Sequence, residues 1–290
     1  MDLSLKKDIK NLLKSYQIRP SKGLGQNFLV DKNAINRIIR AAELSSEDIV
    51  LEIGPGSGSL TQELAKKVKK VVAVEKDQKL IGILNNELRI KGVKNVRVIQ
   101  GDILKPSPYL RAAAKFLILN SCKLVGNLPF YLTAPVIKQF LESENPPKTM
   151  ILVVQKEVGQ RICTKPGKMS ILAVSVQVYA EPEIISYISK KSFWPRPKVD
   201  SAIIKLTPHS DKNRAVARFL SDLPRGFFRV VKAGFSQPRK QLINNLTRKL
   251  NLDRSEVERW LLKNNINPTQ RAETLSVEDW LKLTKSFRIE

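Results

Sequence analysis

The stretch LEIGPGSGSLT, residues 51–61, decides the fold. A short apolar run leads into three glycines, Gly54, Gly56 and Gly58, and a helix-like segment follows them. This order predicts a strand, a tight turn and a helix, the unit from which α/β proteins are built. The G-x-G-x-G spacing differs from the dinucleotide fingerprint, and the Gly-Lys-Ser/Thr of a P-loop is absent. The stretch therefore indicates a loop whose backbone comes close to a ligand, because glycine permits that approach.

Short β-rich runs alternate with helical stretches from residue 49 onward. Strands are predicted at 49–53, 70–75, 95–100, 122–126, 149–155, 183–188 and 202–207. Helices are predicted at 59–69, where Ser59 and Gln62 have capping-box spacing, and at 133–143, where Pro135 stands near the start. Apolar strands joined by helical crossovers predict a mostly parallel, seven-stranded α/β sheet with helices on both faces.

The pattern changes after LTPHSDKNR, residues 206–214. No strand pattern follows, and residues 212–263 hold 13 Lys and Arg against four Asp and Glu. Helix starts are predicted at Asp253 and Ser276, each followed three residues later by an acid. We therefore expect two domains, an α/β domain at 1–210 with an N-terminal extension, and a smaller, basic, all-helical domain at 211–290.

The overall charge favours a polyanionic partner. The 290 residues include 51 Lys and Arg and 27 Asp and Glu, a net charge of +24. Neutralising phosphates releases counterions and drives binding to nucleic acid. A membrane-surface role is the competing interpretation, but no long basic amphipathic helix with an aromatic face is evident, and no run reaches the roughly 20 apolar residues of a spanning helix.

Two residue types limit the chemistry. His209 is the only histidine, which argues against a histidine triad or a histidine-ligated metal, so no metal is expected. Cys122 and Cys163 lie within apolar segments, which is typical of reduced thiols in the core of a cytoplasmic protein.

Two further predicted strands end in acids. Glu75 ends the second strand, where a carboxylate can accept hydrogen bonds from both ribose hydroxyls of a nucleoside. Asp102 follows the third strand, where it can accept from an adenine amino group. Each acid alone is more simply a solvated strand end. Ligands of open α/β sheets bind at the carboxyl ends of the strands, so the combination predicts a nucleoside site.

The stretch KLVGNLPFYLT, residues 123–133, places a glycine, an asparagine and a proline at the end of the fourth predicted strand. Taken alone, this cluster is a turn, with aromatic residues facing the core. The glycine loop and the strand-end acids, however, resemble those of the class I S-adenosylmethionine-dependent methyltransferases, while an NAD oxidoreductase stays a minor alternative. In a methyltransferase, the Asn127 side-chain oxygen and the Leu128 carbonyl would accept from a target adenine amine. Pro129 fixes the turn, and Phe130 would stack on the flipped base.

The whole chain resembles the small-subunit rRNA adenine N6,N6-dimethyltransferases (the KsgA family). The resemblance covers about 260 residues, through SKGLGQNFLVD (21–31), VQKEVGQRICTKPG, FWPRPKVDSAIIKL, FSQPRKQLINNL and RAETLSVEDW. It implies an S-adenosylmethionine site that includes Asn27, Leu29, Gly54, Glu75, Asp102 and Asn127. It also implies dimethylation of two adjacent adenosines near the 3′ end of small-subunit rRNA in an assembling ribosomal subunit.

Two departures from the family pattern are visible. Phe130 stands where the family often has Tyr, which keeps the stacking but removes a hydroxyl. The segment KPGKMSILAVSV lacks a few residues, which leaves the conformation of 165–172 open. Two alternatives remain: a large-subunit rRNA adenine methyltransferase of the antibiotic-resistance type, and a ribosome-assembly factor whose methylation is incidental.

Four basic residues of the predicted helical domain are the candidates for RNA contact: Arg229, Lys232, Arg239 and Lys240. The alternative for each is a solvated helix face. A basic N-terminal stretch, Lys6 to Lys22, is the second candidate surface. We expect a monomer, and we expect Glu75 to govern cofactor affinity with little effect on folding.

Overall fold

The computed structural model describes residues 3, 5–21, 23–105, 122–143, 145–209 and 223–287. Residues 211–222, the start of the predicted helical domain, lie outside these ranges, as does Lys22 of the predicted basic stretch. The chain forms two compact units. The first comprises Met1–Gly159 and Pro182–Pro208, and the second comprises Gln160–Glu181 and His209–Glu290.

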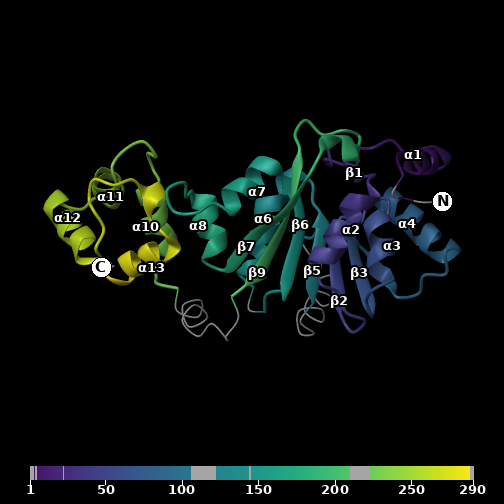
Figure 1. Cartoon of the computed structure of the whole chain (residues 1–290), viewed down its shortest axis with the longest axis horizontal. Helices are drawn as coiled ribbons and strands as arrows, with labels where there is room; N and C mark the ends of the chain where they lie inside the picture. Colours follow the sequence, from purple (N-terminus) through teal and green to yellow (C-terminus); the bar gives the residue numbers. More distant parts are fainter. Residues whose placement is uncertain are drawn as a thin grey trace. The chain divides into compact units, whose positions relative to one another are not determined.

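A seven-stranded sheet forms the centre of the first unit (Figure 1). Its strands are β2 (Ile49–Ile53), β3 (Lys70–Glu75), β4 (Val96–Gln100), β5 (Lys123–Asn127), β6 (Thr149–Gln155), β7 (Ala180–Ile188) and β9 (Ser201–Pro208). The order across the sheet is β4-β3-β2-β5-β6-β9-β7. Strands β4 to β6 in this order are parallel, and β9 pairs antiparallel with β6. The predicted mostly parallel seven-stranded sheet is confirmed.

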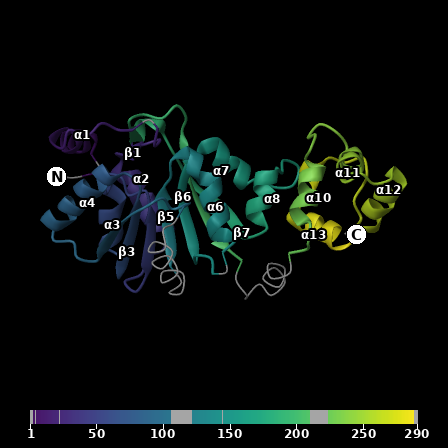
Figure 2. The same cartoon turned by 180° about the vertical axis from the view of Figure 1, so that it is seen from behind.

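Helices connect the strands of the first unit and cover both faces of the sheet (Figures 1 and 2). They are α1 (Lys6–Ser15), α2 (Lys32–Ala41), α3 (Ser59–Ala65), α4 (Gln78–Ile90), η1 (Phe130–Leu132), α6 (Thr133–Leu141) and η2 (Lys190–Ser192). Helix α7 (Lys156–Ile162) begins in the first unit and ends in the second. Val50 and Val125 pack against α2 and α3 on one face, whereas their neighbours Leu51 and Leu124 point the other way and are equally buried. Burial on both faces explains why these strands are apolar throughout.

A second, two-stranded sheet was not predicted. It pairs β1 (Phe28–Leu29) antiparallel with β8 (Phe193–Trp194), and the rings of Phe28 and Trp194 stack with centroids 6.4 Å apart. This small sheet joins the SKGLGQNFLVD and FWPRPKVDSA motifs, although about 165 residues separate them in the sequence. It thereby places residues 24–29 beside the carboxyl ends of the main strands.

Helix α3 begins as predicted, but the predicted capping box is wrong. Gly58, in the left-handed conformation with φ of 83°, occupies the N-cap position, and Ser59 is already the first helical residue. The Ser59 hydroxyl instead donates to the carbonyl oxygen of Leu29 at 3.4 Å. The turn before α3 requires a positive φ at its last residue, and glycine adopts this conformation without steric strain. The hydroxyl consequently ties the glycine loop to β1.

The second unit is helical in its described ranges, as predicted. Its helices are α8 (Ile171–Gln177), α10 (Phe227–Gly234), α11 (Leu242–Leu250), α12 (Arg254–Lys263), η3 (Ala272–Thr274) and α13 (Val277–Lys285). The predicted starts are confirmed, because Asp253 caps α12 and Ser276 forms a capping box with Asp279 at α13. The core packs around Phe227 and Trp280.

The helical unit also contains residues 160–181, which the sequence did not assign to it. Met169, Ala173 and Val174 belong to the same apolar core as Phe227 and Trp280. The predicted boundary between residues 210 and 211 thus lies near the last crossing of the chain from one unit to the other, between Pro208 and His209. The two earlier crossings, after Gly159 and after Glu181, were not predicted. Within the described ranges, no helix is long and apolar enough to cross a membrane.

Candidate active site

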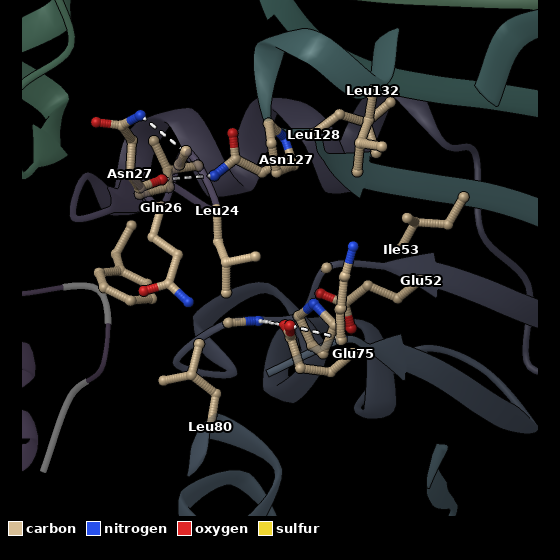
Figure 3. Close-up of a pocket in the computed structure, with 18 of the residues that line it drawn as sticks. Leu24, Gln26, Asn27, Glu52, Ile53, Glu75, Leu80, Asn127, Leu128 and Leu132 are labelled. Carbon is tan, nitrogen blue, oxygen red and sulfur yellow. Dashed lines mark hydrogen bonds between the residues drawn. The ribbon is translucent and has the colours of Figure 1, made fainter. Parts of the chain in front are cut away.

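The carboxyl ends of the first four parallel strands border a pocket, shown in Figure 3. Ten of the eleven residues predicted for cofactor binding and catalysis line it: Asn27, Leu29, Gly54, Gly56, Glu75, Asp102, Asn127, Leu128, Pro129 and Phe130. Gly58 does not. A Cβ on Gly58 would lie 2.4 Å from Leu84, so this glycine serves the turn and the packing of α4. The assignment of Gly58 to the cofactor is therefore not supported by its position.

The glycine loop is held against the end of β3 by two hydrogen bonds, of which the first runs from the Gly54 N–H to the Val74 carbonyl at 2.9 Å. The Gly56 N–H donates to Glu75 Oε2 at 3.1 Å. The backbone at Gly56 has a φ of 57°, and an added Cβ would lie 3.1 Å from the Phe28 ring. Both constraints require glycine here, because a side chain would strain the backbone and push against β1. The loop is thus fixed before any ligand arrives.

Glu75 is far more embedded than a solvated strand end. Only 8% of its surface is exposed, and the other carboxylate oxygen, Oε1, accepts from the N–H groups of Lys76 and Asp77 at 2.8 and 2.9 Å. Burial raises the pKa of Glu75, and the three backbone donors oppose this rise by stabilising the charged form. This environment argues against the expectation that Glu75 has little weight in folding, because its loss would leave three donors without their acceptor.

Asp102 lies at the same edge of the sheet and is paired. Its Oδ2 accepts from Lys76 Nζ at 2.9 Å, and its Oδ1 accepts from the Leu104 N–H at 3.0 Å. Partial burial acts to raise the pKa of Asp102, but these hydrogen bonds and the charge of Lys76 outweigh it, and the pKa is lowered. The carboxylate is ionised at neutral pH and can accept from a ligand amine.

Asn127 closes the opposite side of the pocket. Its Nδ2 donates to the backbone carbonyl of Asn27 at 2.9 Å, and Figure 3 shows this bond across the top of the pocket. A carbonyl only accepts, so the bond determines which end of the amide is the nitrogen. No residue in the described ranges donates to Asn127 Oδ1. The oxygen is thus left available to a ligand.

The residues after Asn127 differ in exposure. Leu128 is buried, and Phe130 is half-buried on η1, whose first turn is closed by a hydrogen bond from the Leu132 N–H to the Pro129 carbonyl at 2.9 Å. Tyr131 is 51% exposed and also lines the pocket. The turn predicted from the sequence is therefore present, and both of its aromatic side chains, Phe130 and Tyr131, line the pocket, while neither of them is buried in the core.

The N-terminal motif is anchored over the pocket by polar contacts. Gln26 donates from Nε2 to Asp77 Oδ2 at 2.8 Å, and its Oε1 accepts from the Ser21 N–H at 2.7 Å. At Gly25, with a φ of 62°, a Cβ would lie 3.3 Å from Pro129. The motif therefore lies against the start of α4 and against the turn formed by residues 127–130 (the NLPF turn). Contacts with both elements explain why many positions of the motif are constrained.

Sequence reasoning missed one acid in the pocket wall. Glu52, on β2, lines the pocket and is only 1% exposed. Figure 3 shows its carboxyl group on the same side of the pocket as Glu75. The signal was present in the sequence, because Glu52 is the single charged residue in the apolar run IVLEI, two positions before the first glycine of the loop.

The four candidate RNA contacts lie in the helical unit. Arg229 and Lys232 are exposed on α10, opposite the buried Phe227 and Val230. Arg239 and Lys240 are exposed in the turn before α11. That turn is held by Asn245, whose Nδ2 donates to the carbonyls of Gly234 and Gln237 at 2.7 and 3.0 Å.

The remaining candidate groups for metal or thiol chemistry stand apart from the pocket. In the part of the chain that the structure describes, no group of three or more His, Cys, Asp or Glu side chains is arranged to hold a metal ion. Cys122 and Cys163 are not joined by a disulfide, and burial raises the pKa of Cys122 to about 11.

The strand order, the glycine loop and the two acids at neighbouring strand ends define a class I S-adenosylmethionine-dependent methyltransferase fold. Comparison with known proteins identifies the family within this class to which the chain belongs. The chain belongs to the ribosomal RNA adenine dimethylase family, whose model matches residues 18–288.

Relatives and solved structures agree with this membership. A Dehalococcoides mccartyi protein named ribosomal RNA small subunit methyltransferase A is 40% identical over 286 residues, covering 98% of this chain and 94% of the relative. A Bacillus thuringiensis protein of the same name is 39% identical over 291 residues, covering 99% and 97%. A Plasmodium falciparum dimethyladenosine transferase has a TM-score of 0.70 at 26% identity and covers 87% of this chain and 94% of its own. The 23S rRNA methyltransferase ErmE has a TM-score of 0.66 at 28% identity, with 89% and 98% covered.

Proposed function

We infer that this protein is an S-adenosylmethionine-dependent small-subunit rRNA (adenine-N6,N6)-dimethyltransferase. Family membership and the names of its relatives support the activity and the substrate class. The observation that carries the chemistry is the free Asn127 Oδ1, held at the rim of the pocket that contains the glycine loop and Glu75. We further propose that the targets are two adjacent adenosines near the 3′ end of the rRNA.

The pocket residues fit S-adenosylmethionine. The carboxylate of Glu75 would accept from the ribose hydroxyls, and Asp102 would accept from the adenine amine. The glycine loop exposes backbone to the ligand, and Asn27 and Leu29 close the site from the β1 side. The cofactor supplies an electrophilic methyl group on a positively charged sulfur. No phosphate-binding lysine or third dinucleotide glycine is present, so an NAD oxidoreductase is not favoured.

The NLPF turn would orient the target base. An adenine N6 amine is a weak nucleophile, because its lone pair is delocalised into the ring. Asn127 Oδ1 and the Leu128 carbonyl would accept its two hydrogens and turn the lone pair out of the ring plane. Pro129 fixes the turn, and Phe130 would stack on the extruded base. Such orientation, with preorganised acceptors, accelerates transfer without a general base.

We propose that the helical unit binds rRNA through Arg229, Lys232, Arg239 and Lys240. All four side chains are exposed, and Asn245 holds the turn that carries the last two. Arginine and lysine on one exposed surface contact phosphates independently of sequence. The basic stretch near α1 is the alternative surface, and its charge-reversed variant is a separate test.

Action on an assembling small subunit, a monomeric state and a cytoplasmic location remain predictions. The large-subunit alternative shares the fold, since ErmE superposes well. The small-subunit assignment is favoured because the relatives that match nearly the whole chain at about 40% identity carry that name. An assembly factor without activity is not favoured, because every proposed reacting group is present in the pocket.

A methyl-transfer assay tests the proposal. Purified protein would be incubated with labelled S-adenosylmethionine and either unmethylated small subunits, naked small-subunit rRNA or large subunits. We expect label in small-subunit rRNA, with primer extension stopping at two adjacent adenosines near the 3′ end. Asn127→Ala is the matched negative control. Label confined to large-subunit rRNA would establish the alternative, and no label in any RNA would overturn the enzymatic assignment.

A further inference from the structure

The pocket has one exposed aromatic ring in its lining. Four aromatic side chains of the described ranges line the pocket: Phe28, Phe130, Tyr131 and Phe193. Phe28 and Phe193 are buried and Phe130 is half-buried, whereas Tyr131 is 51% exposed. A single exposed aromatic residue is ordinary on a protein surface. Tyr131, however, belongs both to the surface and to the pocket lining, so its ring is available to a substrate that enters the pocket.

The Tyr131 ring is held in place by the protein on one side. A Cβ built on Gly25 would lie 3.7 Å from Tyr131 Cε1 and 3.8 Å from its Cδ1, which is van der Waals range. The turn η1 that carries the ring is closed by the hydrogen bond from the Leu132 N–H to the Pro129 carbonyl. An aromatic ring that is already positioned loses little conformational entropy when a ligand stacks on it.

A cation lies near the same ring. The pKa of Lys76 is raised, chiefly by the hydrogen bond and the charge of Asp102 and to a smaller extent by Tyr131, which requires the phenol to lie near the ammonium. The Lys76 side chain is more than half exposed, and Asp102 accepts only one of the three hydrogens that the ammonium can donate. A ring beside such a cation matches a nucleotide, which offers a base for stacking and an anionic phosphate.

The proposed substrate brings a second base within reach of Tyr131. Phe130 would stack on the adenosine that is methylated, and Tyr131 follows at a Cα separation of about 3.8 Å. The other adenosine of the pair is joined to the target by a single phosphodiester link, so its base must lie close to the target. Extrusion of the target also deprives this neighbour of a stacking partner, and an exposed ring can replace that partner.

We propose that Tyr131 is a further substrate-binding residue, whose ring stacks on the base of the nucleotide next to the target adenosine. The ligand of this second subsite is an unpaired purine nucleotide of the RNA, distinct from the base that Asn127 and Phe130 receive. This inference rests on the proposed function, because it takes two adjacent adenosines as the substrate.

A double-mutant cycle between Tyr131 and the RNA tests the proposal. Unmethylated small subunits would be reconstituted with rRNA in which one adenosine of the pair is an abasic site, with a separate substrate for each position. The measurement is kcat/KM for methylation of the adenosine that remains. With one of the two substrates, the wild type should lose about fivefold, the low end for one base–aromatic stack. Tyr131→Ala should lose about fivefold on unmodified subunits and nothing further on that abasic substrate.

Two further variants separate stacking from packing. Tyr131→Leu keeps an apolar side chain beside Gly25 but has no ring, so it should behave as Tyr131→Ala does. Tyr131→Phe keeps the ring and should restore both the rate and the sensitivity to the abasic site. Wild-type kcat/KM in Tyr131→Leu would show that the side chain only fills space, and it would overturn the inference.

Tyr187→Ala is the matched control. Tyr187 is 46% exposed and lies in the first unit, but it does not line the pocket. Its loss should change neither kcat/KM nor the sensitivity to an abasic site.

Cofactor binding provides an independent check on the role of Tyr131. Titration calorimetry should give the same S-adenosylmethionine affinity for Tyr131→Ala and the wild type, and a weaker affinity in the variant would make Tyr131 a cofactor contact and overturn the inference. Equal sensitivity of the wild type and Tyr131→Ala to both abasic substrates would also overturn it, while leaving the proposed function intact. No methylation of unmodified small subunits by the wild type would overturn the proposed function itself.

Discussion

The side-chain amide of Asn127 donates to the backbone carbonyl of Asn27 at 2.9 Å, across a sequence separation of 100 residues. This bond joins the NLPF turn to the N-terminal motif and sets the direction of the amide. The oxygen that would receive a target amine is thus oriented by a backbone group, which a side-chain rotation cannot move. Asn127 thus holds the turn and, in the proposed function, would also orient the target amine.

Asn127→Ala should slow the chemical step by about 10²–10³-fold, because it removes one preorganised acceptor at the reacting centre. It should also lower the melting temperature slightly, since the Asn27 carbonyl loses its donor. Single-turnover methylation beside a melting curve measures both effects. Asn95→Ala is the control, because the Asn95 side chain likewise donates to backbone carbonyls, those of Ala65 and Val68, but lies outside the pocket. A normal single-turnover rate in Asn127→Ala would show that the NLPF segment is only a structural turn and that Asn127 does not orient the target amine.

Phe130→Ala should weaken capture of the target base by about 1–3 kcal/mol, the value of one base–aromatic stack. Phe130→Tyr should be nearly silent, since the ring is kept. The KM for the RNA substrate, measured with cofactor affinity as a check, reports the loss. Tyr131→Ala is the comparison, because Tyr131 is adjacent and more exposed. A larger effect of Tyr131→Ala would move the stacking role to that ring.

Glu75→Ala should reduce S-adenosylmethionine affinity by about 1.5–3 kcal/mol, because a charged acceptor for the ribose is lost. It should also destabilise the fold, since the N–H groups of Gly56, Lys76 and Asp77 lose their acceptor. Glu75→Gln keeps the shape and one acceptor oxygen, so its effects should be smaller. Titration calorimetry and thermal melting separate the two losses. Unchanged affinity in Glu75→Ala would contradict the ribose assignment.

Glu52 should make the stability of the cofactor-free protein depend on pH. Its ordinary pKa of 4.5 rises to about 8 in the fold, so its contribution to stability is fully present below pH 4.5 and is lost as the pH rises through 8. Glu52→Gln cannot ionise. The melting temperature of the variant minus that of the wild type should therefore grow from pH 5.5 to pH 8.5. A difference that stays constant over this range would show that Glu52 is not protonated in the folded state.

Reversing Arg229, Lys232, Arg239 and Lys240 to Glu should weaken RNA binding and flatten its dependence on salt. The logarithmic slope should fall by roughly 0.7–0.9 for each phosphate that the variant no longer neutralises. S-adenosylmethionine affinity should not change. The control reverses Lys66, Lys67, Lys69 and Lys94, which are exposed in the first unit, so the change in net charge is the same. Equal effects of the two variants would indicate a general charge effect, and an unchanged slope would place the RNA surface elsewhere.

The strands of the main sheet were predictable because each is an apolar run long enough to have a recognisable pattern. β1 and β8 were not, since each has two residues and exists only through the other. The capping box at Ser59 failed for a related reason, because the sequence does not reveal that Gly58 adopts a left-handed conformation and occupies the cap position itself.

The sequence predicted those pocket residues that stand at the ends of strands or in the glycine loop. Gly54, Gly56, Glu75, Asp102 and Asn127 come together because parallel strands bring their carboxyl ends to one edge. Glu52 was missed although it is the single charged residue in the apolar run IVLEI, because that signal marks a buried acid without showing whether it faces a pocket or is paired in the core. The sequence did not assign helix α8 to the helical unit, because an amphipathic pattern shows that a helix has a buried face but not which element covers that face.

Residues 160–179 belong to the helical unit but precede β7 and β9 in the chain. During synthesis, their apolar side chains, including Met169 and Val174, emerge well before Phe227 and Trp280, with which they form a core. In the growing chain, this apolar segment therefore lacks part of its core partners until Trp280 has been added. A chain stopped at residue 210 would keep that segment exposed, so chaperone dependence and aggregation of nascent or truncated chains follow directly from the order of segments along the sequence.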